Sequence, residues 1–245
     1  RGDRMKTLVA MDTKSVVGKS LVEERTGQPC ENFRNGDHTT TLIRTENGKV
    51  IEIQHDVMTP QPYNRLYQLT GTKGLANKYP IEGYALDAKQ LNASGVAPEV
   101  DNLNSHSFMP KKDMEALVQK YQHPILKKYG EMAKEVGGHG GMDFIMDSRL
   151  VYCLQNGLPL DMDVYDLAEW CCLAELGELS MDNNCAAVAF PDFTRGEWNK
   201  VKGYKHAYAS PEDESVAMEK AKKITAKLKE KGAVEWAGEA VENKK

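Results

Sequence analysis

Several features that mark other protein classes are missing from this 245-residue chain. It has no apolar run long enough to cross a bilayer, and residues 1–10 contain no signal-peptide apolar core. A net charge of −4 and a pI near 5.9 give no electrostatic reason to bind nucleic acid. Hydrophobic content of 40% with 28% charge is ordinary, so we expect a globular protein with no nucleic-acid partner and no membrane span.

Cysteine is also scarce, and its spacing excludes the usual cysteine-based frameworks. The five cysteines are odd in number and form no CxxC pair. The adjacent residues Cys171 and Cys172 have a poor spacing for zinc. We therefore expect buried free thiols and no metal site.

A nucleotide-phosphate cradle is missing as well, although "GGHGGMDFIMDSRL" (residues 137–150) is rich in glycine. A dinucleotide fingerprint needs a strand followed by GxGxxG, whereas residues 131–136 look helical and the glycine spacing is wrong. The glycines instead predict a sharp elbow between two helices. His139 at this elbow either reaches into a cleft or only satisfies backbone groups at the helix start. Asp143 can share a helical face with it.

The first third of the chain has the spacing of strands and turns. Lys6–Asp12 predicts a short buried strand, and another is expected over Asn64–Thr70. Between them, Asn47-Gly48 predicts a type I′ hairpin turn within residues 38–57, because both central positions need positive φ. These segments indicate an antiparallel meander and not a doubly wound parallel sheet.

Helical spacing begins at Lys111, after a polar stretch over residues 80–110 that reads as a long surface insertion. Helices are expected over residues 111–136 with a break before Pro124, and over 142–157, 163–176 and about 210–232. Asp163 is the expected N-cap of the third of these helices.

Candidate site residues outside the glycine stretch are few. In "TPQPYNR" (residues 59–65) two prolines hold the backbone extended, so that Tyr63 is placed at a sheet edge. Tyr63 could bind a sugar hydroxyl or move a proton, or it could simply be half buried on the sheet. "PDFTRGEW" (residues 191–198) is better explained as a loop stapled by two aromatics with an Asp–Arg pair. The carboxylates are too scattered to identify a glycosidase acid/base pair.

Four stretches taken together resemble one known family. They are "RGDRMKTLVAMD", "GKVIEIQHDVMTPQPYNRLYQLTGTKG", "KKYGEMAKEVGGHGGMDFIMDSRLVYCLQNGLPLDMDVYDLAEW" and "PDFTRGEW". The chain resembles glycoside hydrolase family 109, the NAD-dependent N-acetylgalactosaminidase group of the Gfo/Idh/MocA superfamily. The resemblance runs from Arg1 to about Trp198.

This resemblance implies a fold and a domain organisation. The full chain of that family begins with a Rossmann domain that holds NAD, followed by a Tyr-Pro-Thr-His segment just upstream of "RGDR". This sequence contains neither and does not begin with Met, so we expect the C-terminal part of a longer enzyme. The implied class is α+β: an open, mainly antiparallel sheet with helices on one face. The expected division is a substrate-side domain over residues 1–198 and a helical extension over 199–245.

For function, the resemblance implies a retaining glycosidase that releases terminal N-acetylgalactosamine from a glycan. NAD, bound mainly by the missing N-terminal domain, oxidises the sugar at C3; elimination expels the aglycone, water adds, and the hydride returns. A pair of catalytic carboxylates is then unnecessary. By resemblance the upstream His and Tyr do much of this chemistry, so the fragment alone is expected to be inactive. Tyr63 matches the family's substrate-contacting tyrosine. His139 is a second candidate, and Tyr165 is a third for which core packing is the competing explanation.

Alternatives from other classes stay open. One is a sugar oxidoreductase of the same superfamily, and another is a stand-alone domain for sugar binding or oligomerisation. The resemblance also implies a homo-oligomer that packs through the sheet face. Members of the family are often bacterial and exported.

Overall fold

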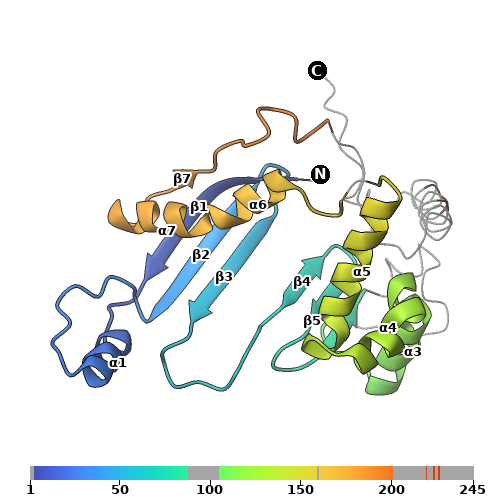
Figure 1. The fold of residues 1–245 in the computed structure, drawn as a ribbon, viewed down its shortest axis with the longest axis horizontal. Helices are drawn as coiled ribbons and strands as arrows, with labels where there is room; N and C mark the ends of the chain where they lie inside the picture. The colour runs from blue at the N-terminus through green and yellow to red at the C-terminus, as the bar shows by residue number, and fades with distance from the viewer. Residues whose placement is uncertain are drawn as a thin grey trace. The chain divides into compact units, whose positions relative to one another are not determined.

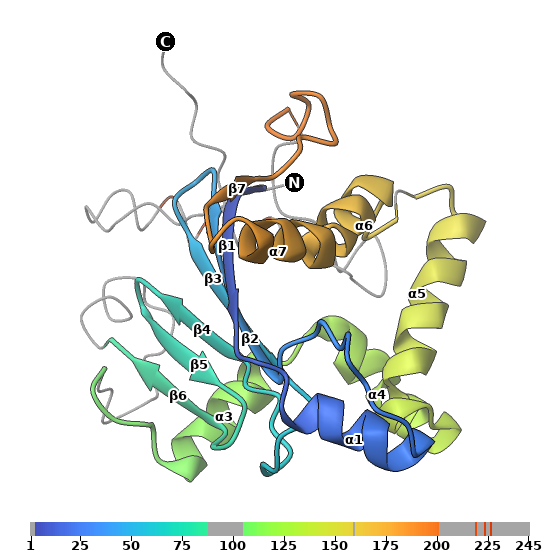
Figure 2. The same ribbon diagram turned by 90° about the vertical axis from the view of Figure 1, so that its left-hand side faces the viewer.

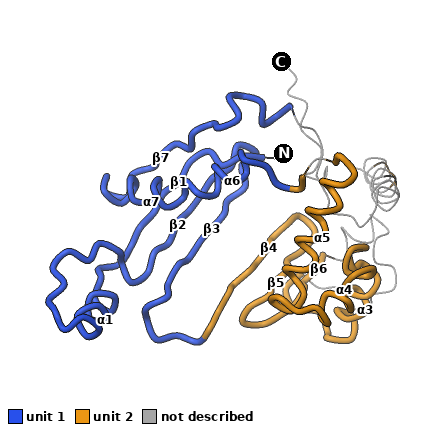
Figure 3. The backbone as a smooth tube through the Cα atoms, viewed as in Figure 1, with its two compact units in different colours: residues 1–62, 162–204, 240–245 blue, residues 63–161, 205–239 orange. Residues whose placement is uncertain are grey.

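The computed structural model describes residues 3–87, 105–158 and 160–200, together with residues 219, 223 and 226. The chain divides into two compact units (Figure 3). Unit 1 comprises residues 1–62, 162–204 and 240–245, and unit 2 comprises residues 63–161 and 205–239. All strand pairings among the described residues are antiparallel, and both units combine helices with sheet, which confirms the expected α+β class.

Unit 1 contains a four-stranded sheet in the order β3-β2-β1-β7 (Figure 1). Its strands are β1 (Met5–Asp12), β2 (His38–Thr45), β3 (Val50–Asp56) and β7 (Val188–Ala189). A hairpin joins β2 to β3 at Asn47-Gly48 as predicted, but the expected type I′ turn is wrong: Gly48 has a φ of 78°, whereas Asn47 is not among the residues with positive φ. The Gly48 N–H donates to the Thr45 carbonyl instead. The sequence predicts a loop where β7 lies. Strand β7 is too short to show a strand pattern in the sequence, because only Val188 and Ala189 pair with β1.

The core of unit 1 lies between this sheet and helix α7 (Leu173–Asp182), which packs against β1 and lies beside it in Figures 1 and 2. Leu8, Ala10 and Ile43 are buried together with Phe190, and α7 packs against them. The buried Ser180 accepts a hydrogen bond from the Ala10 N–H at 3.0 Å. This serine satisfies a strand N–H beyond the end of the short β7.

Helix α6 (Val164–Cys171) precedes α7 and begins where the sequence predicts. Asp163 is its N-cap, as expected, and it also forms a capping box with Asp166. The helical run is longer than predicted, because it turns at Cys172 and continues as α7 to Asp182.

Helix α1 (Val17–Thr26) is not evident from the sequence, because its N-cap residue Val16 supplies no side-chain cap. The buried carboxylate of Asp37 supplies it instead, accepting hydrogen bonds from the N–H groups of Val16, Val17 and Gly18. The bonds from Gly18 and Val17 are the main reason that the pKa of Asp37 lies below its usual value.

Unit 2 contains a second sheet and the remaining helices. They are β4 (Gln68–Gly71), β5 (Gly74–Asn77), β6 (Gly83–Leu86), α3 (Lys111–Tyr121), α4 (Pro124–Val136), the 3₁₀ turn η1 (His139–Gly141) and α5 (Met142–Gln155). The break predicted before Pro124 is confirmed, as is the stop at Gly157, which has a φ of 62°.

The strand predicted over Asn64–Thr70 is wrong in two ways: it begins only at Gln68, and it belongs to this separate sheet. The β4–β5 register pairs Gln68 with Asn77, and the Lys78 N–H still reaches the Tyr67 carbonyl. Two residues further, Pro80 would lie opposite Arg65, and proline has no N–H to continue the ladder.

The expected burial of the thiols holds only for Cys153; Cys171 is exposed, and Cys30, Cys172 and Cys185 are half-buried, although all five are free. Within the described ranges, no helix is both long and apolar enough to cross a membrane. The surface insertion predicted over residues 80–110 is wrong in part, because Gly83–Leu86 form strand β6 and pair with β5. Residues 88–104 and most of the predicted terminal helix lie outside the described residues. Glu219, Lys223 and Ala226 are helical, and Lys223 pairs with Glu219 at 2.7 Å.

Candidate functional site

The segment that leads to Tyr63 is fixed at its start by one carboxylate. Asp56, at the end of β3, accepts hydrogen bonds from the Thr59 hydroxyl at 2.6 Å and from the N–H groups of Met58 and Thr59. The bonds from Thr59 hold the pKa of Asp56 down at about 2. Gln61 donates to the Asp56 carbonyl at 3.1 Å. The turn is therefore ordered by a single ionised side chain just before the chain enters unit 2.

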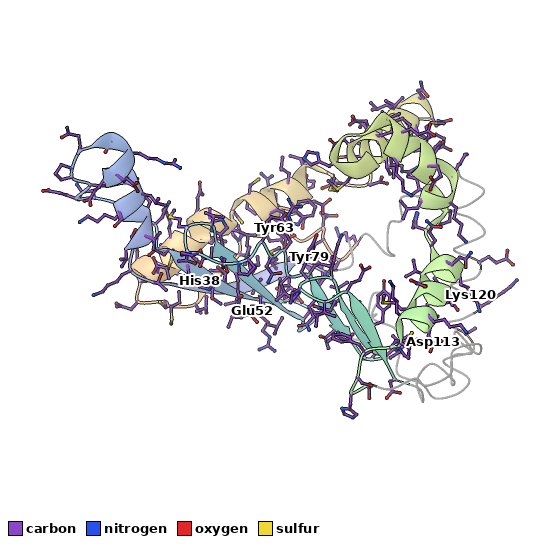
Figure 4. All side chains as sticks on the ribbon, turned by 90° about the horizontal axis from the view of Figure 1, so that it is seen from below. His38, Glu52, Tyr63, Tyr79, Asp113 and Lys120 are labelled. Atoms are coloured by element: carbon purple, nitrogen blue, oxygen red, sulfur yellow. The ribbon has the colours of Figure 1, made fainter. Side chains whose placement is uncertain are left out.

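Tyr63 is 71% exposed, so it is not the half-buried sheet residue of the competing interpretation. Its ring contacts Tyr79 edge to face, with centroids 6.5 Å apart and an interplanar angle of 89°. The Arg65 guanidinium lies 5.3 Å from the centre of the Tyr63 ring. Figure 4 shows Tyr63 and Tyr79 side by side. The Tyr63 ring is thus held from two sides.

Tyr79 is itself held by the second sheet. The Asn77 side chain, at the end of β5, donates to the carbonyls of Tyr79 and Ile81 at 3.1 and 2.6 Å. Sequence reasoning missed Tyr79 and Arg65 as neighbours of Tyr63. The available signal was chemical: no Asp or Glu occurs between Asp56 and Glu82.

The glycine stretch forms the predicted elbow between α4 and α5 (Figure 2). Residues 137–141 all have positive φ, from 45° at His139 to 96° at Gly141. A Cβ on Gly141 would lie 2.6 Å from the Ala133 carbonyl carbon, so only glycine allows this close approach.

His139 does not cap the helix, because α5 has no side-chain cap. Its Nδ1 lies 2.9 Å from Asp143 Oδ2, which confirms that the two side chains share a face. The imidazole is 75% exposed. Asp143, with Tyr129, Asp147 and Tyr152, helps to line an open pocket of about 610 Å³ between α4 and α5, but His139 is not among its lining residues.

The third candidate, Tyr165, lies in the first turn of α6 in unit 1 and is 44% exposed, so core packing does not explain it. Tyr63 and His139 share unit 2, but no direct contact joins them among the described residues. Asp192 in the last motif does not pair with Arg195 as expected. It accepts hydrogen bonds from Thr194 and Gly196, which lower its pKa.

The described residues do not fit a resident metal or a dinucleotide. Across those ranges there is no cluster of three or more His, Cys, Asp or Glu that could hold a metal ion. The glycine stretch follows helix α4 and not a strand, so it lacks the strand–turn–helix arrangement that cradles a pyrophosphate.

Comparison with known proteins identifies the family. Residues 1–200 match the family described as glycosyl hydrolase 109, C-terminal domain. The chain belongs to glycosyl hydrolase family 109. It is 83% identical over its full length to glycosyl hydrolase family 109 protein 5 of Phocaeicola vulgatus, and covers 47% of that relative. It is 60% identical over 209 residues to the family 109 protein of Porphyromonas gingivalis, covering 44% of it.

The chain therefore spans about half the length of the curated relatives it matches. The chain is also 84% identical over 240 residues to glycosyl hydrolase family 109 protein 4 of Phocaeicola vulgatus, and it covers 46% of that relative. The stretches from which the family was inferred all lie within residues 1–200.

Proposed function

We propose that this chain is the substrate-side part of a longer NAD-dependent glycosidase that releases terminal N-acetylgalactosamine. Membership of family 109 and the half-length match to its relatives support this proposal. The observation that carries it is the presentation of Tyr63, which is exposed but fixed by Tyr79 and Arg65. A phenol held in this way can donate to a sugar hydroxyl and can cover the apolar face of the ring.

The redox step would belong to polypeptide outside this chain. NAD supplies reversible hydride transfer when it is bound, and the described residues offer no cradle for it. Oxidation at C3, elimination, water addition and re-reduction would follow the course implied by the family. The residues of this chain would bind and orient the sugar, and the chain alone would be inactive.

The test is Tyr63→Phe in the longer protein that contains this chain. Loss of one sugar hydrogen bond should lower kcat/KM for N-acetylgalactosaminides about tenfold or more. Circular dichroism and the melting temperature should not change, because the hydroxyl is exposed. Tyr67→Phe is the matched control, since Tyr67 is an exposed tyrosine of the same segment and no aromatic ring contact is found for it among the described residues. If Tyr63→Phe and Tyr67→Phe had the same kcat/KM, Tyr63 would not contact the substrate.

The same assay distinguishes the two possible reaction types. A glycosidase of this kind releases aglycone without net production of NADH, because the hydride returns to C3. Net NADH accumulation without aglycone release would show a sugar oxidoreductase instead. Tight binding of N-acetylgalactosamine by this chain without NAD would favour a stand-alone binding domain.

We also propose that the sheet face opposite α7 is the oligomer contact. On β1, β2 and β3 this face carries the exposed apolar side chains of Met11, Leu42 and Val50. Leu42→Glu should shift the protein to a smaller species in light scattering. An unchanged mass would exclude this face.

A further inference from the structure

The chain around Tyr63 has an unusual charge. The protein contains 36 acidic residues and has a net charge of −4, yet residues 57–81 include no Asp or Glu. The same stretch contains three cations, Arg65, Lys73 and Lys78. An acidic protein therefore has a local positive region, and this region includes both members of the tyrosine pair.

Two of these cations lie against the tyrosines. The Arg65 guanidinium is 5.3 Å from the centre of the Tyr63 ring, and Lys78 Nζ is 5.9 Å from the centre of the Tyr79 ring. The two rings contact each other edge to face. The Lys78 N–H also bonds to the Tyr67 carbonyl, which fixes the backbone from which Lys78 extends. The four side chains thus form one cluster in unit 2.

Neither Arg65 nor Lys78 forms a salt bridge within the described ranges. Other exposed lysines of the protein do pair with acids one helical turn away, as Lys111 does with Glu115 and Lys134 with Glu131. A solvated surface cation is the ordinary explanation for an unpaired Arg or Lys. That explanation does not account for 25 consecutive residues without an acid in a chain with this composition.

The chemistry of the cluster selects its ligand. A guanidinium that lies over an aromatic ring, as Arg65 does over Tyr63, can still present N–H groups to paired oxygens. Carboxylate and sulfate groups present such oxygens. The tyrosines offer rings and hydroxyls to a sugar. Together these groups fit a saccharide that bears a negative charge.

We propose that Tyr63, Tyr79, Arg65 and Lys78 form a subsite for an acidic sugar, one that carries sulfate or carboxylate next to the N-acetylgalactosamine to be released. This proposal rests on the proposed function, because it places the glycan at Tyr63. It adds a substrate class: acidic glycans should be preferred over otherwise identical neutral ones.

The experiment compares three forms of one N-acetylgalactosamine-terminated oligosaccharide with the longer protein: neutral, sulfated and sialylated on the adjoining sugar. The measured quantity is the ratio of kcat/KM for each acidic form to that for the neutral form. This ratio should exceed one and should fall about tenfold in Arg65→Gln and less in Lys78→Gln, because a charge-assisted bond to the anion is lost. The acidic form with the larger ratio identifies the anion.

Lys73→Gln is the matched control. It removes one positive charge from the same stretch, but Lys73 lies in the turn between β4 and β5, whereas the cations over the two tyrosine rings are Arg65 and Lys78. It should leave the ratio unchanged. A ratio that falls equally in all three variants would show only a general field effect and would overturn the subsite.

Two other results would also overturn the proposal. One is a wild-type ratio of one for both acidic forms. The other is an increase in KM for NAD in Arg65→Gln with an unchanged glycan ratio, which would assign the cation to a cofactor phosphate. Failure of the proposed function has a different signature, because Tyr63→Phe would then have no effect on any of the three substrates.

Discussion

The two units of this protein bury their residues very differently. In unit 1 the side chains of Leu8, Ala10, Ile43 and Phe190 form one core cluster under α7. In unit 2 the buried apolar residues are not joined into a core cluster of this kind among the described residues, and most of the apolar side chains of α5 are exposed. These buried residues are Ala85, Met109, Ile125, Ala133 and Cys153. The tyrosine cluster and the His139–Asp143 pair both belong to unit 2. We therefore expect the clustered core of unit 1 to contribute more to the stability of the protein, whereas the tyrosine cluster lies in unit 2.

The strongest way to test this comparison is to damage the core of unit 1. Leu8→Ala should lower the free energy of unfolding by roughly 2–5 kcal/mol, because it leaves a cavity under α7. Denaturant titration measures the loss, and native-state hydrogen exchange assigns it to a unit. The protection lost should be in β1, β2 and α7, with β4–β6 less affected.

Leu167→Ala is the control, since it makes the same change on α6 of unit 1 at a side chain that is 57% exposed. Its effect should stay within about 0.5 kcal/mol. A loss in Leu8→Ala no larger than in this control would show that unit 1 does not contain the main core.

The elbow of unit 2 gives a smaller and more local test. Gly141→Ala combines a φ of 96° with a Cβ placed 2.6 Å from the Ala133 carbonyl carbon. It should cost roughly 2–4 kcal/mol, and protection should fall in α4 and α5. Gly140→Ala is also left-handed, with a φ of 70° and a ψ of 24°, but has open space around the new Cβ, so it should cost only about 1–2 kcal/mol. Equal effects of the two substitutions would mean that the contact between Gly141 and α4 is not tight in solution.

How far each feature could be predicted depends on how local its cause is. The position of the hairpin at Asn47-Gly48 and the Asp163 cap follow from neighbouring residues, and both are confirmed, although the turn is not of the predicted type I′. The origin of α1 is not local, because its cap, Asp37, is about 20 residues further along the chain. The same holds for the site: Tyr63 could be identified from its motif, whereas its contact with Tyr79 depends on the sheet that β4–β6 form.

The smallest expected effect is the loss of stability of unit 1 in acid, which depends on its carboxylates with lowered pKa. In unit 1 Asp56 has a pKa of about 2, and those of Asp37 and Asp192 are also lowered, mainly by bonds from neighbouring N–H and hydroxyl groups. A carboxyl group with a lowered folded-state pKa stabilises the fold above its unfolded pKa, near 3.8. That stabilisation is lost as the pH falls through the folded value. The melting temperature should therefore drop between about pH 4 and pH 2.

Asp56→Asn should flatten this drop, because the amide cannot be protonated in that range and keeps one acceptor oxygen for Thr59. At pH 7 the variant should be slightly less stable than the wild type, and the two melting curves should converge as the pH approaches 2. Asp12→Asn, at an exposed position on β1, should leave the pH profile of the wild type unchanged. If Asp56→Asn and Asp12→Asn gave the same profile, the turn before Tyr63 would not depend on an ionised Asp56. The turn that precedes Tyr63 would then be ordered by its backbone hydrogen bonds and not by the charge of Asp56.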